Sequence, residues 1–394
     1  MKVLIIHCTY QYKGGEDTVV AEETRLLKAH GMTVETLLFS NTGGTVGKIL
    51  QLPFNIGSYR ATRQKIKAFK PDIVHIHNLH FAASFSIPYA LKAEGIPFVT
   101  TLHNFRYICP SATLFHRNKP FTDSIRQRFP WTAVRQGVYK DSRLLTFWLA
   151  FSMSLHRRLG TLDLCSRYIV LSEHAKKLFL SCPIGLDAEK LVIKQNFCDP
   201  SPVKGTHDND HFLFVGRLSE EKGIATLLDA FARSAHKIKI AGDGPLKEEV
   251  IRYAGLFPNI EYVGLLEKKE VLSLLSECTA LIFPSVWPEG MPMTIIEAFS
   301  CGTPVIASRL GVMESMITNG SNGLHFEAGN GTDLLNKLHR WADMNLTERA
   351  GFYENALATF DKYYTPEKNF ELLSDIYTDA IKLNGYSIYS PTAS

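Results

Sequence analysis

The chain has 394 residues, of which 45% are hydrophobic and 21% are charged, and this composition fits a globular protein of about two domains. The formal net charge of +4 is divided unevenly, because residues 1–200 carry 26 Lys and Arg against 14 Asp and Glu, and residues 201–394 carry 17 against 25. The longest apolar run, 144–155, is too short to span a membrane, and seven scattered cysteines without a CxxC pair indicate neither a zinc site nor a disulfide framework.

The first half of the chain predicts an α/β domain. Short apolar, β-branched runs at 3–8, 73–77, 98–103, 168–171 and 191–194 alternate with helical patterns, which is typical of a parallel sheet covered on both faces. We expect the apolar N-terminus to be the first of these strands rather than a signal peptide.

A glycine loop follows the first strand. Gly14 and Gly15 are adjacent, so the loop is not the GxGxxG fingerprint of a dinucleotide site, and a dehydrogenase is disfavoured. The two glycines allow a ligand to approach the backbone, and Glu16 follows them beside the start of the next helix. The alternative is a plain strand-to-helix turn with an acid near the helix N-terminus.

Histidines stand at the carboxyl ends of the next two strands, where parallel sheets bind ligands. His103 ends the strand at 98–103 and is a candidate for contact with substrate. His75, His77 and His80 have a spacing that resembles metal ligation, but no carboxylate or thiolate motif completes a set, so we expect no metal there.

The segment 111–160 is basic and aromatic, with nine Lys and Arg and only two acids, Asp123 and Asp141. This mixture is typical of a protein that touches an anionic membrane surface. The alternative is that 144–155 forms a core helix flanked by solvated cations.

A polar stretch at 199–210 reads as a linker, so we expect two domains, at 1–200 and 201–394. The linker string Asp208-Asn209-Asp210 matches a DxD metal motif only formally, because no strand precedes it. A second series of strands follows at 212–215, 238–241, 260–263, 280–283 and 305–307.

The loops after these strands carry groups suited to a nucleotide. Arg217 and Lys222 supply the two cations that a diphosphate needs. The loop after 280–283 holds Glu289, which is suited to sugar hydroxyls, and the helix behind it holds Glu297, which is suited to ribose hydroxyls. The free N–H groups at the start of that helix favour a phosphate.

These motifs together resemble the retaining glycosyltransferases of family GT4. The resemblance rests on GGE, on HN after the third clear strand, on VGRL with EKG, on GDGP, and on the pair of glutamates separated by seven residues within PEGMPMTIIEAFSCGTPVIAS. It implies the GT-B fold, in which two Rossmann-like domains face each other across a deep cleft, with a C-terminal helix that crosses back to the N-terminal domain. Many relatives carry Asp after the histidine, where this chain has Asn104.

The resemblance assigns roles to individual positions. The catalytic set would be His103, Glu289, Arg217 and Lys222. The donor would lie against Gly216, Gly242, Asp243, Gly264, Gly290, Met291, Pro292, Met293, Thr294 and Glu297. The acceptor side would be the glycine loop of Gly14, Gly15 and Glu16.

We therefore expect an enzyme that moves a hexose from a nucleoside diphosphate sugar, first UDP-glucose, to a saccharide or lipid-linked saccharide. Transfer would proceed with retention, without a metal or other cofactor and without nucleic acid. The expected setting is surface polysaccharide synthesis in the cytoplasm, with contact at the inner face of the cell membrane. Two alternatives remain open: a nucleotide-sugar epimerase of the same fold, and a non-catalytic sugar-binding protein.

Overall fold

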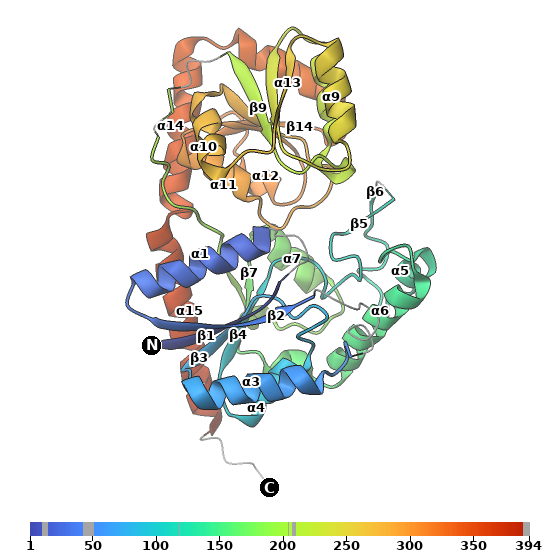
Figure 1. Cartoon of the computed structure of the whole chain (residues 1–394), viewed down its shortest axis with the longest axis vertical. Coiled ribbons are helices and arrows are strands. Elements are labelled where there is room, and N and C mark those ends of the chain that lie inside the picture. The colour runs from blue at the N-terminus through green and yellow to red at the C-terminus, as the bar shows by residue number, and fades with distance from the viewer. Residues whose placement is uncertain (10–14, 42–50, 118, 204, 207–209, 389–394) are drawn as a thin grey trace. The chain divides into compact units, whose positions relative to one another are not determined.

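A computed structural model describes residues 1–9, 15–41, 51–117, 119–203, 205–206 and 210–388. The chain divides into two compact units (Figure 1). The first unit consists of residues 1–114, 121–196 and 369–394, and the second of residues 115–120 and 197–368.

The first unit is built on a six-stranded parallel sheet with the order β2-β1-β3-β4-β7-β8. Its strands are β1 (Lys2–Thr9), β2 (Thr33–Ser40), β3 (Ile73–Ile76), β4 (Phe98–Leu102), β7 (Arg167–Val170) and β8 (Leu191–Ile193). Its helices are α1 (Gly15–Ala29), α3 (Ile56–Phe69), α4 (Ser86–Ala93), α5 (Trp131–Gln136), α6 (Arg143–Arg158), α7 (Glu173–Ser181) and the terminal α15 (Pro366–Ile388).

The second unit repeats this plan, with a parallel sheet in the order β11-β10-β9-β12-β13-β14. Its strands are β9 (His211–Val215), β10 (Lys237–Ala241), β11 (Ile260–Gly264), β12 (Ala280–Phe283), β13 (Val305–Ser308) and β14 (Gly323–Phe326), and a short antiparallel pair joins β5 (Phe115–His116) to β6 (Lys119–Pro120). Its helices are α8 (Ile224–Ala232), α9 (Lys247–Leu256), α10 (Lys268–Glu277), α11 (Met293–Ser300), α12 (Met313–Met316), α13 (Gly331–Asp343) and α14 (Leu346–Tyr363).

All ten strands expected from the sequence are present, and two edge strands, β2 and β14, were not expected. In β2 only Val34 is buried, and half-buried and exposed positions alternate along the rest of the strand, so β2 lacks the continuous apolar run that marks the other strands. The strand β14 begins with Gly323, where a Cβ atom would lie 2.1 Å from the carbonyl oxygen of Val305. A strand that starts on a glycine carries little sequence signal.

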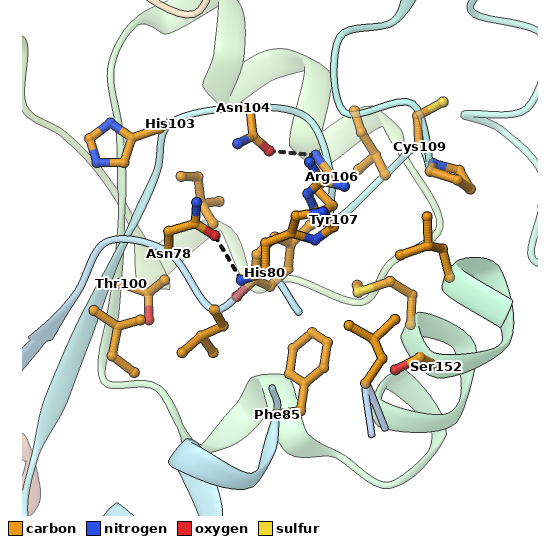
Figure 2. Close-up of a pocket in the computed structure, with 18 of the residues that line it drawn as sticks. Asn78, His80, Phe85, Thr100, His103, Asn104, Arg106, Tyr107, Cys109 and Ser152 are labelled. Atoms are coloured by element: carbon orange, nitrogen blue, oxygen red, sulfur yellow. Dashed lines mark hydrogen bonds between the residues drawn. The ribbon is translucent and has the colours of Figure 1, made fainter. Parts of the chain in front are cut away.

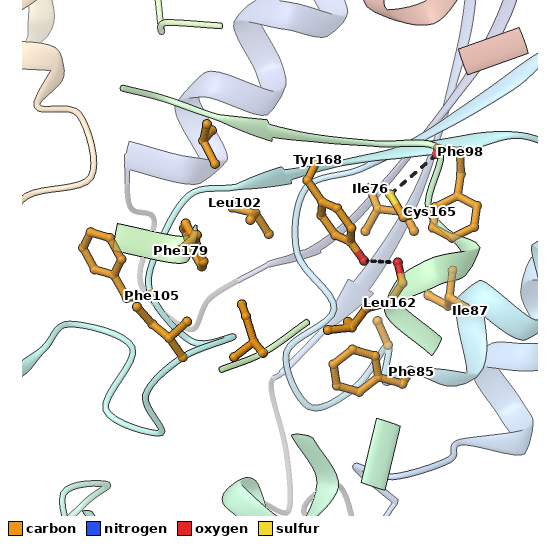
Figure 3. Packing of buried hydrophobic residues seen from close by; sticks show 14 of the residues in the cluster. Ile76, Phe85, Ile87, Phe98, Leu102, Phe105, Leu162, Cys165, Tyr168 and Phe179 are labelled. Carbon is orange, nitrogen blue, oxygen red and sulfur yellow. Dashed lines mark hydrogen bonds between the residues drawn. The ribbon is translucent and has the colours of Figure 1, made fainter. Parts of the chain in front are cut away.

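The first sheet is covered on both faces, which explains its continuous apolar strands. On β1, Leu4, Ile6 and Cys8 pack into one cluster, whereas Val3 and Ile5 pack into another on the opposite face. Figure 3 shows the first cluster, where the Tyr168 hydroxyl donates to the carbonyl of Leu162 over 2.8 Å. Similarly, Cys165 Sγ donates to the carbonyl of Phe98 over 3.6 Å.

The terminal helix α15 covers the second face of this sheet. Its buried residues Leu373, Ile376, Tyr377 and Ala380 pack in the cluster that contains Val3 and Ile5. The C-terminal helix therefore returns to the N-terminal domain, as the GT-B resemblance implies. The expected division at residue 200 needs this refinement, since residues 369–394 belong by contact to the first unit.

All seven cysteines are buried and unpaired with one another. No helix among the described residues is long and apolar enough to cross a bilayer. The apolar run at 144–155 lies within α6, where Leu149 and Ala150 are buried but Leu144 is 75% exposed and Phe151 is 38% exposed. The helix thus combines the core face and the exposed apolar surface that the sequence had left as alternatives.

Candidate active site

Three glycines at the carboxyl ends of neighbouring strands bring their backbones together in the second unit. Gly216 follows β9, Gly242 follows β10 and Gly264 ends β11. Gly242 N donates to Gly264 O over 2.8 Å, and a Cβ atom on Gly242 would lie only 1.9 Å from Gly216 O. The predicted glycines therefore line up along one sheet edge, and at Gly242 the absence of a side chain is a packing requirement.

Two predicted charges stand at the same edge. Arg217 is exposed, and no carboxylate of the described residues lies within 4 Å of its guanidinium. Asp243 is also exposed, and its Oδ1 accepts from Gly244 N over 2.8 Å while its carbonyl accepts from Leu218 N over 2.9 Å. Arg217 is thus free to meet an anion, whereas Asp243 shapes the turn.

Glu289 is a buried carboxylate that three side chains hold by hydrogen bonds. It is 6% exposed, and its Oε1 accepts from Lys222 Nζ (2.7 Å), Ser285 Oγ (2.6 Å) and Trp287 Nε1 (2.7 Å). Lys222 also lies 5.7 Å from the centre of the Trp287 ring, a cation–π contact. An ammonium has three donors, so Lys222 retains donors for a second anion while it pairs with Glu289.

The helix that carries Glu297 begins at Met293, with Pro292 as its N-cap residue and no side chain capping it. Its first N–H groups are therefore available to a ligand. Gly290, Met293, Thr294 and Glu297 are half-buried, and Pro292 and Met291 are buried. These residues and the Glu289–Lys222 pair all follow strand ends of one sheet.

In the first unit, Glu16 is held by two amides. Asn104 Nδ2 donates to Glu16 Oε1 over 2.8 Å, and Asn78 Nδ2 donates to Oε2 over 3.1 Å. Gly15 begins α1 one residue earlier, and Gly14 lies outside the described residues. Asn104, which departs from the pattern of many relatives, thus serves as a donor to a neighbouring carboxylate.

His103 is connected to a buried ion pair. Its Nε2 lies 2.9 Å from His77 Nδ1, and His77 Nε2 lies 3.4 Å from Glu23 Oε2. Glu23 Oε1 accepts a hydrogen bond from Lys194, and both side chains are fully buried. A His77 tautomer with its proton towards Glu23 leaves Nδ1 to accept from His103, so that His103 Nδ1 becomes an acceptor for substrate.

The protonation states in this cluster follow from burial. Burial alone would raise the pKa of Glu23, but Lys194, His75 and His103 together outweigh burial and hold that pKa below its ordinary value. Burial lowers the pKa of His75 to about 3, and it also lowers the pKa of His77 and of His103. At neutral pH the three imidazoles are uncharged, and Glu23 is a carboxylate.

The sequence indicated no carboxylate that would complete a metal-binding set with these histidines, and that prediction is wrong, because Glu23 lies beside two of them. Glu23, His75 and His77 place ligand atoms within 4.8 Å of one another, a grouping that could hold a metal ion. However, Lys194 supplies a cation to Glu23, and the nitrogens of His75 already bond Tyr377 Oη (2.8 Å) and Thr101 Oγ1 (2.7 Å). A metal would have to displace these partners.

A pocket opens beside His103 at the ends of β3 and β4 (Figure 2). Its lining includes His77, Asn78, His80, His103 and Asn104 from these strand ends. It also includes Arg106 and Arg157, which the sequence did not single out for this position. Only the packing of α6 over the strand ends reveals that the two arginines share one pocket.

Two family models match consecutive parts of the chain. Residues 13–201 match "Glycosyltransferase Family 4", and residues 201–358 match "Glycosyl transferases group 1". Together the two matches extend from residue 13 to residue 358, which is most of the chain.

Individual proteins agree with these models. The chain is 34% identical over 33% of its length to an uncharacterised glycosyltransferase of Methanocaldococcus jannaschii, MJ1178, of which it covers 38%. It is 28% identical over 78% of its length to the O-antigen chain mannosyltransferase C of Escherichia coli, of which it covers 84%. Among solved structures, Anabaena Alr3699/HepE in complex with UDP superposes with a TM-score of 0.69 at 19% identity, covering 96% of this chain and 100% of that one.

We predict that Asn104→Asp destabilises the protein increasingly as the pH rises. The new carboxylate would lie within hydrogen-bonding distance of Glu16 and would repel it once both are ionised. At low pH a shared proton removes this repulsion, so the loss, roughly 1–3 kcal/mol at neutral pH, should shrink towards pH 4. Thermal unfolding of wild type and variant across pH 4–8 measures the difference, and a pH-independent difference would contradict the contact.

We also predict that Lys194→Met lowers the free energy of unfolding by about 3–5 kcal/mol, because it leaves the Glu23 carboxylate buried without a cation. The double variant Glu23→Gln with Lys194→Met should recover much of that loss. Lys177→Met, an exposed lysine on α7, is the matched control and should change little. Equal melting temperatures of the single and double variants would argue against the ion pair.

Proposed function

This chain belongs to the family 4 glycosyltransferases, and from that premise we propose that it moves a hexose from a nucleoside diphosphate sugar to a saccharide or lipid-linked saccharide acceptor, with retention of configuration. The observation that carries the proposal is the Glu289–Lys222 pair beside Arg217 and the uncapped start of α11. This group offers a buried carboxylate for sugar hydroxyls and several donors for a diphosphate, from the loops that follow the neighbouring strands β9 and β12.

The donor would be held by groups on the second sheet. Arg217, Lys222 and the N–H groups around Met293 would bind the diphosphate, Glu297 the ribose and Glu289 the sugar hydroxyls. The backbones of Gly216, Gly242 and Gly264 would border the base, with the Asp243 turn beside them. UDP-glucose is the first donor to test, and the Anabaena protein of the same fold has been solved with UDP bound.

The proposed chemistry uses the leaving group itself. The acceptor oxygen bonds to the anomeric carbon on the face from which the diphosphate departs, the bond from that carbon to the phosphate oxygen breaks, and this oxygen takes the acceptor proton. Retention often uses a carboxylate nucleophile, but Glu289 Oε1 already accepts three hydrogen bonds and is a poor one. Arg217 and Lys222 would stabilise the departing charge without a metal ion.

The first unit would position the acceptor and the transferred sugar. Burial lowers the pKa of His103, so its ring is uncharged at neutral pH and can accept a hydrogen bond from a sugar hydroxyl. Glu16, fixed by two amides beside the glycine loop, would face the acceptor hydroxyl. The remaining carboxylate lone pairs are available for such a contact.

We further propose that α5 and α6 meet the inner face of the cell membrane, where lipid-linked acceptors for surface polysaccharides would be found. Phe129, Trp131, Phe147, Trp148 and Phe151 form a contiguous ring cluster with centroid separations of 4.6–6.2 Å. Trp131 is 52% exposed. The exposed cations around this cluster are Arg126, Arg128, Arg135, Lys140, Arg143 and Arg158. Exposed rings among cations suit the interface of an anionic bilayer.

The donor assignment predicts that a suitable nucleotide sugar at 100 times its dissociation constant raises the free energy of unfolding by ~2.7 kcal/mol. Arg217→Ala should lower kcat roughly hundredfold, because it removes a charge that meets the leaving diphosphate. Arg217 is a cleaner target than Lys222, whose removal would also strip Glu289 of its cation.

Stability and kcat are measured with a panel of nucleotide sugars, and the products are analysed with and without acceptor. Arg252→Ala, an exposed arginine on α9, is the control. Excess chelator should leave the rate unchanged. An acceptor-independent change of the donor sugar would instead indicate an epimerase.

The membrane assignment predicts that the protein sediments with anionic liposomes at low salt and is released at 1 M salt, where the screening length falls to ~3 Å. Replacing Arg126, Arg128, Arg143 and Arg158 by Glu should abolish sedimentation, since each surface cation contributes ~1 kcal/mol. Donor hydrolysis should persist in this variant. Wild type that ignores anionic liposomes at low salt would point to a soluble acceptor.

A further inference from the structure

The pocket beside His103 contains cations but no acidic side chain. Its lining from β3, β4, α6 and their loops includes two arginines and three histidines, and the rest is apolar or neutral. Figure 2 shows His103 and Asn104 at one side of this pocket and Phe85 and Ser152 at the other. Acceptor-binding groups proposed above thus border an apolar chamber with a positive charge.

Arg106 has buried donors without acceptors. Its Nε and Nη1 atoms are inaccessible and make no hydrogen bond within the described part of the chain. Its backbone N–H, by contrast, donates to Asn104 Oδ1 over 3.0 Å, so the residue itself is firmly placed. No acceptor among the described residues therefore accounts for the position of the Arg106 Nε and Nη1 atoms in the pocket.

Arg157 on α6 also has a buried donor without an acceptor among the described residues. That donor is its Nε, and burial lowers the pKa of its guanidinium. No carboxylate of the described residues lies within 4 Å of either guanidinium. The segments that the structure does not describe contain one acidic side chain, Asp208 in the linker.

Unpaired guanidinium donors in an apolar setting are costly unless a ligand supplies the anion. Two guanidiniums match a group with about two negative charges, such as a phosphomonoester or a diphosphate, better than a single carboxylate. The apolar lining, including Phe85, Leu149 and Met153, would at the same time accommodate hydrocarbon. An amphiphile with a phosphate head group and a hydrocarbon chain has both the charge and the apolar surface that this pocket would accept.

We propose that this pocket binds the acceptor as a phosphorylated lipid, with the phosphate at Arg106 and Arg157 and the first part of the hydrocarbon chain against Phe85, Leu149 and Met153. This inference rests on the proposed transferase function and specifies its acceptor class. Binding there would place the sugar-bearing end of the lipid beside His103 and Asn104.

The test uses the full chain and dodecyl phosphate below its micelle concentration, titrated by calorimetry. Arg106→Gln and Arg157→Gln should each weaken binding about ten- to hundredfold, the range for a lost hydrogen bond to a charged group. Arg157→Lys should recover part of the affinity, because it keeps the charge but not the fork. Arg252→Gln, at an exposed arginine on α9 that belongs neither to this pocket nor to the surface of α5 and α6, should bind like wild type.

Stability provides a second readout that does not depend on the ligand. Without ligand, Arg157→Gln should melt at or above the wild-type temperature, since it removes a desolvated charge that no protein group pairs. An arginine with a structural role would give the opposite result. A lower melting temperature together with unchanged dodecyl phosphate binding would overturn the proposal.

Two further probes separate the possible sources of binding. Dodecyl maltoside should bind far more weakly than dodecyl phosphate, and inorganic phosphate should bind weakly because it lacks the hydrocarbon. Equal affinity for the neutral amphiphile, or full affinity for inorganic phosphate, would overturn the proposal. UDP is titrated separately, so a protein that binds dodecyl phosphate but no nucleotide supports this pocket and contradicts the donor assignment.

Discussion

One buried carboxylate, Glu23, determines how the N-terminal unit is arranged around its candidate site. It lies on α1, pairs with Lys194 at the end of β8, and is close to His75 and His77 at the end of β3. Lys194 also donates to Asn369 on α15 over 3.3 Å, and Tyr377 on the same helix bonds His75. Helices from opposite ends of the sequence are thus tied to one buried charge, and that charge orients His77 and, through it, His103.

In the second unit, backbone contacts between neighbouring loops shape the strand-end edge of the sheet. Gly242 and Gly244 have positive φ angles, and added Cβ atoms would meet the carbonyl oxygens of Gly216 and Leu218 at 1.9 and 2.5 Å. Neighbouring strand-end loops can therefore lie directly against one another. This close approach creates a sheet edge made of peptide groups, beside which Arg217, Lys222 and Glu289 stand as the charged groups.

The excess of cations in the first half of the chain includes arginines with very different surroundings in the first unit. Its cations include two groups of different character: the exposed arginines on and beside α5 and α6, and the half-buried pair Arg106 and Arg157. Exposed cations are solvated at little cost, whereas the buried donor nitrogens of Arg106 and Arg157 have no acceptor among the described residues and would gain from an anion. The half-buried pair is therefore the more specific indication of a ligand.

The sequence by itself determined the ten main strands, the two-part organisation and the loops of the second unit, because glycines and charges directly after apolar runs have local causes. It also singled out two candidate site residues, His103 after a strand and Glu16 after the glycine loop. It did not reveal that Asn78 and Asn104 clamp Glu16, that Lys194 neutralises Glu23, or that Arg106 and Arg157 share a pocket. Those pairs are separated by 51 to 171 positions in the chain, and a buried polar partner leaves no periodic signal, so only the tertiary structure could bring them together.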